Sequence, residues 1–139
     1  MIELDNRTTC HVNISLLERI AESLSKRDIE LILINDLEMA EINEQSRGIA
    51  KSTDVLSFPM VEMPGAPLGS IVISEGFVKS GSERFGHTLA DERALLFIHG
   101  MLHVLGYDHE VDKGEMRTKE HEVLQTFGLP ESLIIRTQQ

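Results

Sequence analysis

The sequence predicts an α+β (mixed α/β) fold, a single domain over residues 1–139 in which a mixed sheet of about four strands is covered by about five helices. Three observations lead to this prediction. A chain of 139 residues is long enough for one domain with a sizeable core. Strand-like segments and helical stripes both occur, and they do not alternate strictly along the chain. No internal repeat or low-complexity segment interrupts the pattern.

Four short segments favour β-strands because they are mainly apolar and are bounded by polar or turn-forming residues. They cover residues 2–6, 30–34, 53–58 and 68–73. Pro59 stops the third segment, because proline lacks the N–H group that a sheet ladder needs. Residues 60–67 contain further prolines and a glycine, so we expect a loop or turn between the third and fourth strands.

Five segments carry apolar residues at helical spacing or helix-capping signals. They cover residues 12–25, 36–47, 74 to the early eighties, 89–105 and 112–128. Four of these helices are expected to be capped by a polar side chain at their start: Asn13, Asp36, Thr88 and Asp112. Asp91 and Glu115 complete two starts that resemble capping boxes, and Gly128 ends the last helix.

The formal charge of −10 argues against a generic nucleic-acid binder, because Lys and Arg neutralise the phosphates in such proteins. A local basic groove, a bound divalent cation or a partner protein can still recruit nucleic acid to an acidic protein. No apolar run approaches the roughly 20 residues of a membrane span, and no signal peptide is visible. Cys10 is the single cysteine, so no internal disulfide is expected and a cytoplasmic location is predicted.

Three of the six histidines lie in one short segment, HGMLHVLGYDH, which runs from His99 to His109. His99 and His103 are four residues apart, so on a helix their imidazoles lie on one face, one turn apart. Gly106 can end that helix, because glycine tolerates the left-handed conformation that a C-cap needs. The chain reversal then brings His109 back toward the other two histidines.

Three converging neutral imidazoles predict a divalent-metal site, for which we favour one zinc ion per chain and keep other divalent metals as alternatives. A coordination position left open for water or substrate is typical of a catalytic zinc rather than a structural one. The remaining histidines stand in polar surroundings and are expected to be ordinary side chains rather than ligands: His11, His87 and His121.

The spacing of the three histidines matches H-E-x-x-H-x-x-G-x-x-H, the pattern of the metzincin metalloproteases. In those enzymes the glutamate after the first histidine is the general base. Gly100 holds that position here and has no side chain. The metal geometry is therefore expected to be present while the protease base is missing.

The same segment closely resembles the H-G-x-L-H-L-x-G-Y-D-H signature of the YbeY family of bacterial endoribonucleases and ribosomal-RNA maturation factors, with Val104 in place of a leucine. Residues 43–47 and 53–59 resemble the family's N-x-x-x-R and T-D-V-L-S-F-P. Residues 68–74 resemble L-G-D-I-V-I-S, although Ser70 stands where the family usually has aspartate. The segments share the family's order and spacing, so the resemblance spans residues from about 30 to 127.

This resemblance implies a zinc-dependent endoribonuclease that cuts single-stranded RNA in ribosomal-RNA maturation (the 3′ end of 16S RNA) and in ribosome quality control. The implied partners are ribosomal RNA, the small ribosomal subunit and its assembly factors. The resemblance also implies a functional Arg47 that faces the metal pocket, where a guanidinium matches phosphate oxygens and stabilises transition-state charge. From residue type alone, the ordinary role of an arginine such as Arg47 at the end of a helix is a charge that favours the helix dipole.

Asp108 stands next to the third histidine, and its residue type fits two different roles. It can accept a hydrogen bond from a ligand imidazole or act as a base, or it can simply favour the turn after Gly106. Because no glutamate follows the first histidine, the general base is left open between Asp108, a hydroxide on the metal and the 2′-hydroxyl of the RNA.

Two other functions fit parts of the pattern. A metzincin-like metal-dependent protease or other hydrolase is suggested by the histidine spacing, and Gly100 argues against it. A ribosome-assembly factor with a mainly structural metal is kept open by the acidic charge and the missing base. Cleavage of RNA by the folded protein distinguishes an enzyme from such a binding factor.

Overall fold

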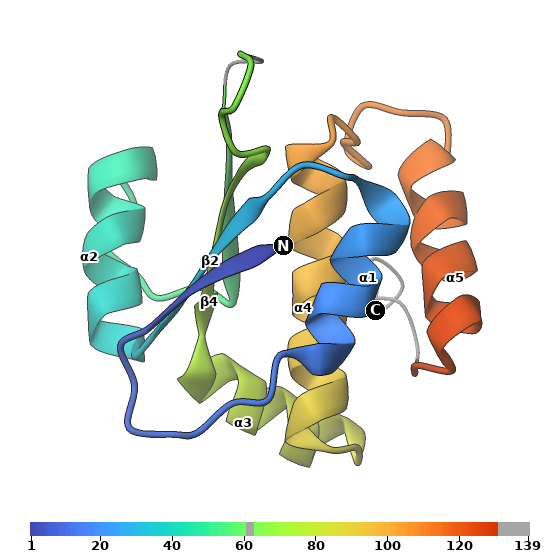
Figure 1. Ribbon diagram of the computed structural model, residues 1–139. Helices are drawn as coiled ribbons and strands as arrows, with labels where there is room; N and C mark the ends of the chain where they lie inside the picture. Colours follow the sequence, from blue (N-terminus) through green and yellow to red (C-terminus); the bar gives the residue numbers. More distant parts are fainter. Residues whose placement is uncertain (61–62, 131–139) are drawn as a thin grey trace.

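The computed structural model describes residues 1–60 and 63–130, which form one four-stranded sheet and five helices (Figure 1). The strands are β1 (Ile2–Asn6), β2 (Ile29–Ile34), β3 (Val55–Pro59) and β4 (Gly69–Ser74). The helices are α1 (Ser15–Leu24), α2 (Asp36–Arg47), α3 (Glu75–Phe85), α4 (Leu89–Val104) and α5 (Glu115–Phe127). The predicted α+β architecture is confirmed, with element ends shifted by a few residues.

The sheet has the strand order β1-β2-β4-β3 and is mixed, as predicted. β1, β2 and β4 are parallel, and their connections pass through helices, as parallel strands require. β3 runs antiparallel to β4, with Leu56 opposite Val72, and lies at one edge of the sheet. This edge position leaves one side of β3 free to border a pocket.

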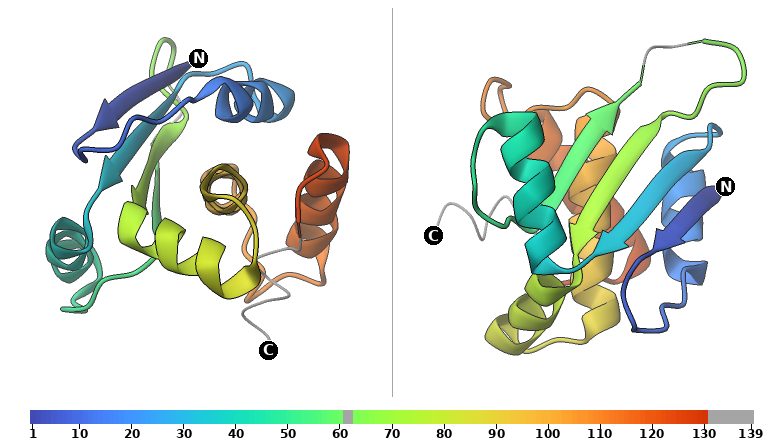
Figure 2. Two further views of the ribbon diagram at one scale, coloured as in Figure 1. Left: turned by 90° about the horizontal axis from the view of Figure 1, so that it is seen from below. Right: turned by 90° about the vertical axis from the view of Figure 1, so that its left-hand side faces the viewer.

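Alternating residues of the strands face two separate hydrophobic layers. Leu31 and Leu33 face the larger core, whereas Ile32 and Ile34 face the smaller core beneath α2. Figure 2 shows α2 alone on one face of the sheet and the other helices on the opposite face. Both faces of the central strand β4 are therefore covered, and all of its residues are buried.

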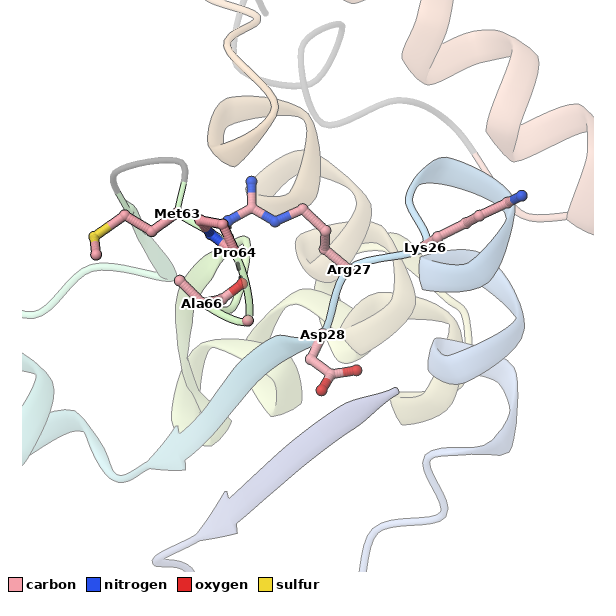
Figure 3. Close-up of a pocket in the computed structure, with 7 residues that line it drawn as sticks. Lys26, Arg27, Asp28, Met63, Pro64 and Ala66 are labelled. Carbon is pink, nitrogen blue, oxygen red and sulfur yellow. Dashed lines mark hydrogen bonds between the residues drawn. The ribbon is translucent and has the colours of Figure 1, made fainter.

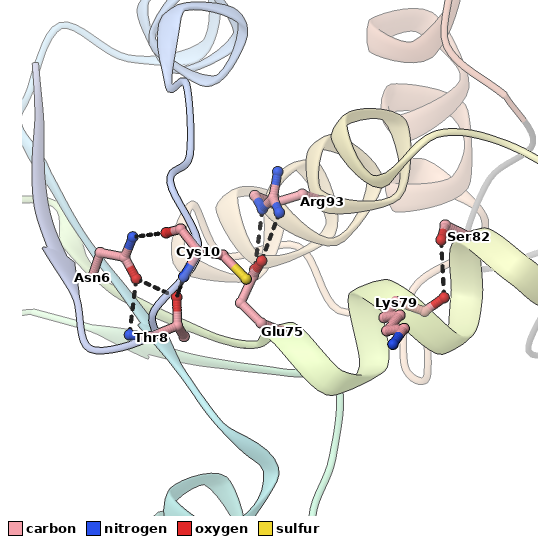
Figure 4. A network of polar contacts seen from close by, with 7 residues as sticks. All are labelled: Asn6, Thr8, Cys10, Glu75, Lys79, Ser82 and Arg93. Carbon is pink, nitrogen blue, oxygen red and sulfur yellow. Dashed lines mark hydrogen bonds and ion pairs between the residues drawn. The ribbon is translucent and has the colours of Figure 1, made fainter.

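Helix α4 is the centre of the larger layer and is buried on nearly every side. It packs against the sheet and against α1, α3 and α5 (Figure 1). A helix that is apolar all round is stable only in such surroundings. Its buried Arg93 is paired through two nitrogens with Glu75 of α3, at 3.0 and 2.6 Å (Figure 4). This central helix carries two of the three clustered histidines.

The helix starts follow the capping predictions only in part. Thr88 caps α4 as predicted, and its side chain accepts the N–H of Asp91. The cap of α2 is Asn35 rather than Asp36, because Asn35 has an extended backbone and its side chain accepts the N–H of Glu38. The carboxylate of Asp36 accepts a hydrogen bond from the hydroxyl of Ser74 instead.

Helices α1 and α5 also begin later than predicted. The N-cap of α1 is Ile14, and Asn13 accepts the N–H of Ser15 from one position earlier. The N-cap of α5 is Gly114, while Asp112 accepts the N–H groups of Gly114 and Met116. In both cases the predicted polar residue does bond the helix start, but from an Asx-type turn before it.

The connection between β3 and β4 is fastened to the start of β2. Arg27 donates hydrogen bonds to the carbonyl groups of Ala66 and Pro67, at 3.3 and 2.8 Å, beside a hollow shown in Figure 3. Residues 61 and 62 of the predicted loop lie outside the described residues, and Pro59 is the last residue of β3 rather than its stop. None of the helices in the described ranges has both the length and the apolar composition to cross a membrane.

Candidate metal centre

The end of α4 sets the direction of all three clustered histidines. His99 and His103 lie on its last two turns, and Gly106 follows with a φ of 103°. The N–H of Gly106 bonds the carbonyl of His103, and the N–H of Tyr107 bonds that of Leu102. This pair of bonds is a Schellman motif, which needs a left-handed residue where Gly106 stands. The reversal brings His109 back beside the helix.

The three imidazoles converge as the spacing predicts. One nitrogen of each ring lies within 4.8 Å of the others, and Nε2 of His103 is 3.2 Å from Nε2 of His99. Two nitrogens bound to one tetrahedral zinc at about 2.0–2.1 Å lie roughly 3.3–3.4 Å apart. The His99–His103 separation therefore fits two ligands of one ion.

The surroundings of the cluster also fit a metal. Burial lowers the pKa of His103, and the neighbouring His99 and His109 lower it further. A lowered pKa keeps the imidazole neutral, and a neutral imidazole is the form that binds a metal. The buried Nδ1 of His109 has no hydrogen-bond partner among the described residues. Buried polar nitrogens without partners are costly, and a cation removes that cost.

A carboxylate that the sequence prediction missed stands behind the first histidine. Oε2 of Glu120, on α5, lies 3.0 Å from Nδ1 of His99. Glu120 looks like a solvated residue in the run Lys119 to Glu122, and it is 21 positions from its partner. Its spacing from Met116 and Val123, both buried, was the available signal, because it places a carboxylate on the apolar stripe of α5.

Arg47 reaches the same site from the opposite side of the sheet. A pocket of about 510 Å³ is lined by Arg47 at the end of α2 and by all three histidines. Asn43, one turn earlier, donates to the carbonyl of Lys51 at 2.8 Å and so holds the connector that follows Arg47. The exposed Arg47 side chain makes no hydrogen bond or ion pair with the described residues. It is therefore available to a ligand in the pocket.

The pocket is acidic apart from Arg47. Asp54, Asp108 and Glu110 also line it. Oδ1 of Asp108 accepts the N–H of Glu110 at 3.0 Å, which orders the turn before α5. Three carboxylates and one guanidinium give the metal-free pocket a negative charge, which attracts a divalent cation and repels phosphate.

The edge strand β3 forms one wall of the pocket. Asp54 accepts the N–H of Val55 at 2.8 Å, and Ser57 donates its hydroxyl to the carbonyl of Gly100 at 3.1 Å. The second bond ties the wall to α4 within one residue of His99. The segment from Thr53 to Pro59 thus has a physical role that its residue types did not reveal: it fixes the distance between the pocket wall and the histidines.

Comparison with known proteins identifies the family. The family model described as endoribonuclease YbeY matches residues 3–128. The chain is 57% identical over 138 residues to an endoribonuclease YbeY of Sulfurimonas denitrificans, with 99% of each chain covered. The chain belongs to the YbeY family. An endoribonuclease YbeY of Helicobacter pylori is 52% identical over 139 residues, again with 99% of each chain covered.

A solved structure supports the same conclusion for the fold of this YbeY chain. The solution structure of a Thermotoga maritima protein matches with a TM-score of 0.66 and 29% identity, covering 91% of this chain and 89% of that one. The resemblance seen in the sequence is therefore confirmed at the level of family and fold.

The packing of α4 explains why this chain has no glutamate after the first histidine. A Cβ atom at Gly100 would lie 2.9 Å from Cγ2 of Ile71 and 3.2 Å from Cγ2 of Val55. Position 100 faces the sheet, so it has no room for a side chain. The base of the metzincin proteases has no counterpart here.

The YbeY chain departs from its family's usual residue at Ser70, and the structure places this residue outside the histidine pocket. Its hydroxyl donates to Oε1 of Glu30 on the neighbouring strand β2, at 2.7 Å. The change therefore belongs to the pairing of β2 with β4.

The other histidines lie apart from the cluster. Among the described residues, the grouping of three possible metal ligands contains only His99, His103 and His109. His87 is not a solvated side chain, because its Nε2 lies 2.7 Å from Oε1 of the buried Glu92.

Proposed function

We propose that this protein is a metal-dependent endoribonuclease that cuts single-stranded RNA during ribosomal-RNA maturation, including the 3′ end of 16S RNA, and in ribosome quality control. The observation that carries the proposal is that Arg47 and the three clustered histidines line one pocket. The relatives named endoribonuclease YbeY support the reaction type. Because His99 is only 8% exposed, a flexible single strand reaches it more easily than the rigid backbone of a duplex.

We propose zinc as the metal, held by His99, His103 and His109. A ligand set of three imidazoles favours zinc and leaves a coordination position open. When bound, the ion supplies Lewis acidity to the phosphate that is cut. It also offsets the negative charge that three carboxylates and one guanidinium give the pocket, a charge that otherwise repels the RNA backbone.

Arg47 then binds phosphate oxygens. Its guanidinium is always charged and its planar fork matches two oxygens at once. Negative charge develops on the phosphate as the bond breaks, and Arg47 stabilises that charge more strongly than the charge of the substrate. The lack of a competing partner in the described chain leaves this role open to it.

Asp108 is the side chain that we propose as proton acceptor. It lines the pocket, and its bond to the N–H of Glu110 holds the carboxylate in place beside His109. The 2′-hydroxyl of the RNA is the group from which it takes the proton if the RNA itself supplies the nucleophile. Gly100 supplies no alternative base.

In this proposal, partner molecules bring ribosomal RNA to the protein. A protein with a formal charge of −10 has little affinity of its own for RNA. We therefore propose that the small ribosomal subunit and its assembly factors, in the cytoplasm, bring the substrate to the pocket.

The test is cleavage of a single-stranded RNA oligonucleotide by protein of measured metal content. Wild type is compared with Arg47→Ala and His103→Ala, each checked for folding by circular dichroism. Arg84→Ala is the matched control, because Arg84 also lies in the last turn of a helix that ends at a left-handed glycine. This control separates a role in the pocket from a general effect on the helix dipole.

We expect wild type and Arg84→Ala to cut equally. Arg47→Ala should lose about 100-fold in rate while it keeps its metal. His103→Ala should lose both metal and cleavage. If all four preparations cut alike, the activity comes from a contaminant and a binding factor with a structural metal becomes the better explanation.

A further inference from the structure

The strongest feature that the proposed function does not use is the contact between α5 and the first histidine. Glu120 is 0% exposed, and its Oε2 lies 3.0 Å from Nδ1 of His99. The contact joins two helices that pack side by side (Figures 1 and 2). It is the contact by which α5 reaches the histidine cluster.

The position of Glu120 on its helix is unusual for a charged residue. Its neighbours on the same face of α5 are buried: Met116, Val123 and Leu124. A carboxylate on such a face costs free energy unless hydrogen-bond donors satisfy it. An apolar residue would serve the packing of α4 against α5 at lower cost. The contact with Nδ1 of His99 gives a carboxylate at this position a hydrogen-bond donor.

The contact determines which nitrogen of His99 carries the proton. A carboxylate accepts hydrogen bonds, so Nδ1 is the nitrogen that donates. In the neutral ring Nε2 then holds the lone pair. Nε2 is the atom that faces His103, at 3.2 Å. The contact therefore aims the lone pair of His99 into the cluster.

We propose that Glu120 is a positioning residue of the metal centre, which fixes the tautomer and the orientation of His99 and raises its strength as a ligand. This inference rests on the proposed function of the three histidines as a metal site. Carboxylates behind ligand histidines commonly act in this way, and their loss lowers metal affinity about 10- to 100-fold. By reciprocity, a bound metal strengthens the docking of α5 onto α4.

The test is zinc affinity, measured by competition with a chelator, in wild type, Glu120→Gln and Glu120→Leu. Glutamine keeps an acceptor for Nδ1–H and loses the charge, whereas leucine removes the acceptor and suits the apolar face. We expect an affinity loss of about 10-fold for glutamine and about 100-fold for leucine. Nitrogen NMR of His99 in the metal-free protein should show the Nδ1–H tautomer in wild type and a mixture in Glu120→Leu.

The matched control is Glu92→Gln. Glu92 is 1% exposed and also pairs with a histidine, His87, at 2.7 Å, but neither residue lines the histidine pocket. We expect this variant to bind zinc as wild type does, even if its melting temperature falls. A general loss of helix packing would weaken zinc binding in both variants.

The outcomes separate this inference from the proposed function. If wild type binds zinc and both Glu120 variants bind it equally well, the role of Glu120 is wrong and the metal centre stands. The same conclusion follows if Glu92→Gln weakens zinc binding as much as Glu120→Leu does. If wild type binds no divalent metal, the proposed metal centre fails, and the positioning role fails with it.

Discussion

Gly100 shows how a single residue decides the chemistry of this pocket. The hydrogen atom in place of a side chain lets α4 approach β3 and β4 closely, with Ile71 and Val55 directly opposite. The same approach allows Ser57 to bond the carbonyl of Gly100. The position that carries the general base in the metzincin proteases therefore serves here to pack the pocket wall against α4.

Replacing Gly100 with alanine is expected to destabilise the protein. Alanine gains about 1 kcal/mol in helix propensity, but its Cβ would lie 2.9 Å from the fully buried Ile71. Such overpacking costs roughly 1–3 kcal/mol, so we expect a net loss of about 1 kcal/mol. Urea denaturation measures it, and a variant as stable as wild type would contradict the close packing.

The site residues differ in how easily they can be predicted from the sequence. The three histidines are predictable because their convergence depends on local geometry, namely one helix turn and one glycine reversal. Arg47 was placed by family resemblance, since its approach to the pocket depends on the whole sheet. The contact of Glu120 was not predicted, because its partner His99 lies on another helix. The one available signal was that Glu120 lies on the buried face of α5.

At the scale of elements, the start of α5 depends on Asp112. Its carboxylate accepts the N–H groups of Met116 and Gly114 at 2.8 and 2.9 Å. These bonds, and more weakly the nearby His109, lower the pKa of Asp112 from its ordinary value of 3.8. The bonds favour the charged carboxylate, so the stability that they contribute depends on pH.

We expect Asp112→Ala to lower the melting temperature by the same amount at about pH 7 and about pH 5. A depressed folded pKa means that the stabilisation is complete above 3.8 and is lost as the pH falls through the lower folded value. The gap between wild type and variant should therefore close only below 3.8. Thermal melts across this pH range measure the difference in melting temperature between the two proteins. If that difference already disappears near pH 6, the titrating group is a histidine and not Asp112.

The pairing of β2 with β4 gives a second prediction at this scale. Glu30 stands directly opposite Ser70 in the register, and the serine hydroxyl donates to it. Introducing the usual family residue by Ser70→Asp places two carboxylates side by side. We expect a loss of roughly 1 kcal/mol in the free energy of unfolding.

The double variant Ser70→Asp with Glu30→Gln should recover most of that loss, because one of the two charges is removed. Zinc affinity should not change in either variant, since Ser70 lies outside the histidine pocket. Urea denaturation and chelator competition measure the two quantities. A loss that Glu30→Gln does not relieve would mean that the aspartate is disfavoured by burial alone.

Element types were easier to predict than element ends. Apolar spacing and capping signals together identified all four strands and all five helices of the described residues, because burial on one or two faces imposes a period and helix starts favour particular polar residues. The ends depend on single hydrogen bonds, and several polar residues compete for each. Asn35 caps α2, whereas the neighbouring Asp36 accepts a hydrogen bond from Ser74 at the end of β4, a contact between distant segments that no local pattern contains.

At the scale of the whole molecule, charge governs how the protein meets RNA. The formal charge is −10 and three carboxylates line the pocket, so we expect attraction within the pocket to come from Arg47 and the proposed metal. Each phosphate neutralised on a single strand contributes about −0.7 to the slope of log K against log salt concentration. We expect a slope between about −0.7 and −1.4, because one or two phosphates are neutralised.

Fluorescence anisotropy of a labelled single-stranded RNA, with zinc present and over a range of salt, measures this slope. Arg47→Ala should flatten it by about 0.7, and Arg84→Ala should leave it unchanged. Removing zinc should weaken binding further. A slope of about −4 or steeper would mean an extended basic path for the RNA, contrary to the confined attraction.

The free edge of β3 bears on whether molecules of this protein aggregate. An exposed strand edge invites the strand of a neighbouring molecule, which is a common start of aggregation. Here Asp54 already occupies the N–H of Val55, and Pro59 has no N–H to offer. A foreign strand therefore finds few donors along this edge. The pocket can stay open to solvent and substrate without making the protein prone to self-association through this edge of the sheet.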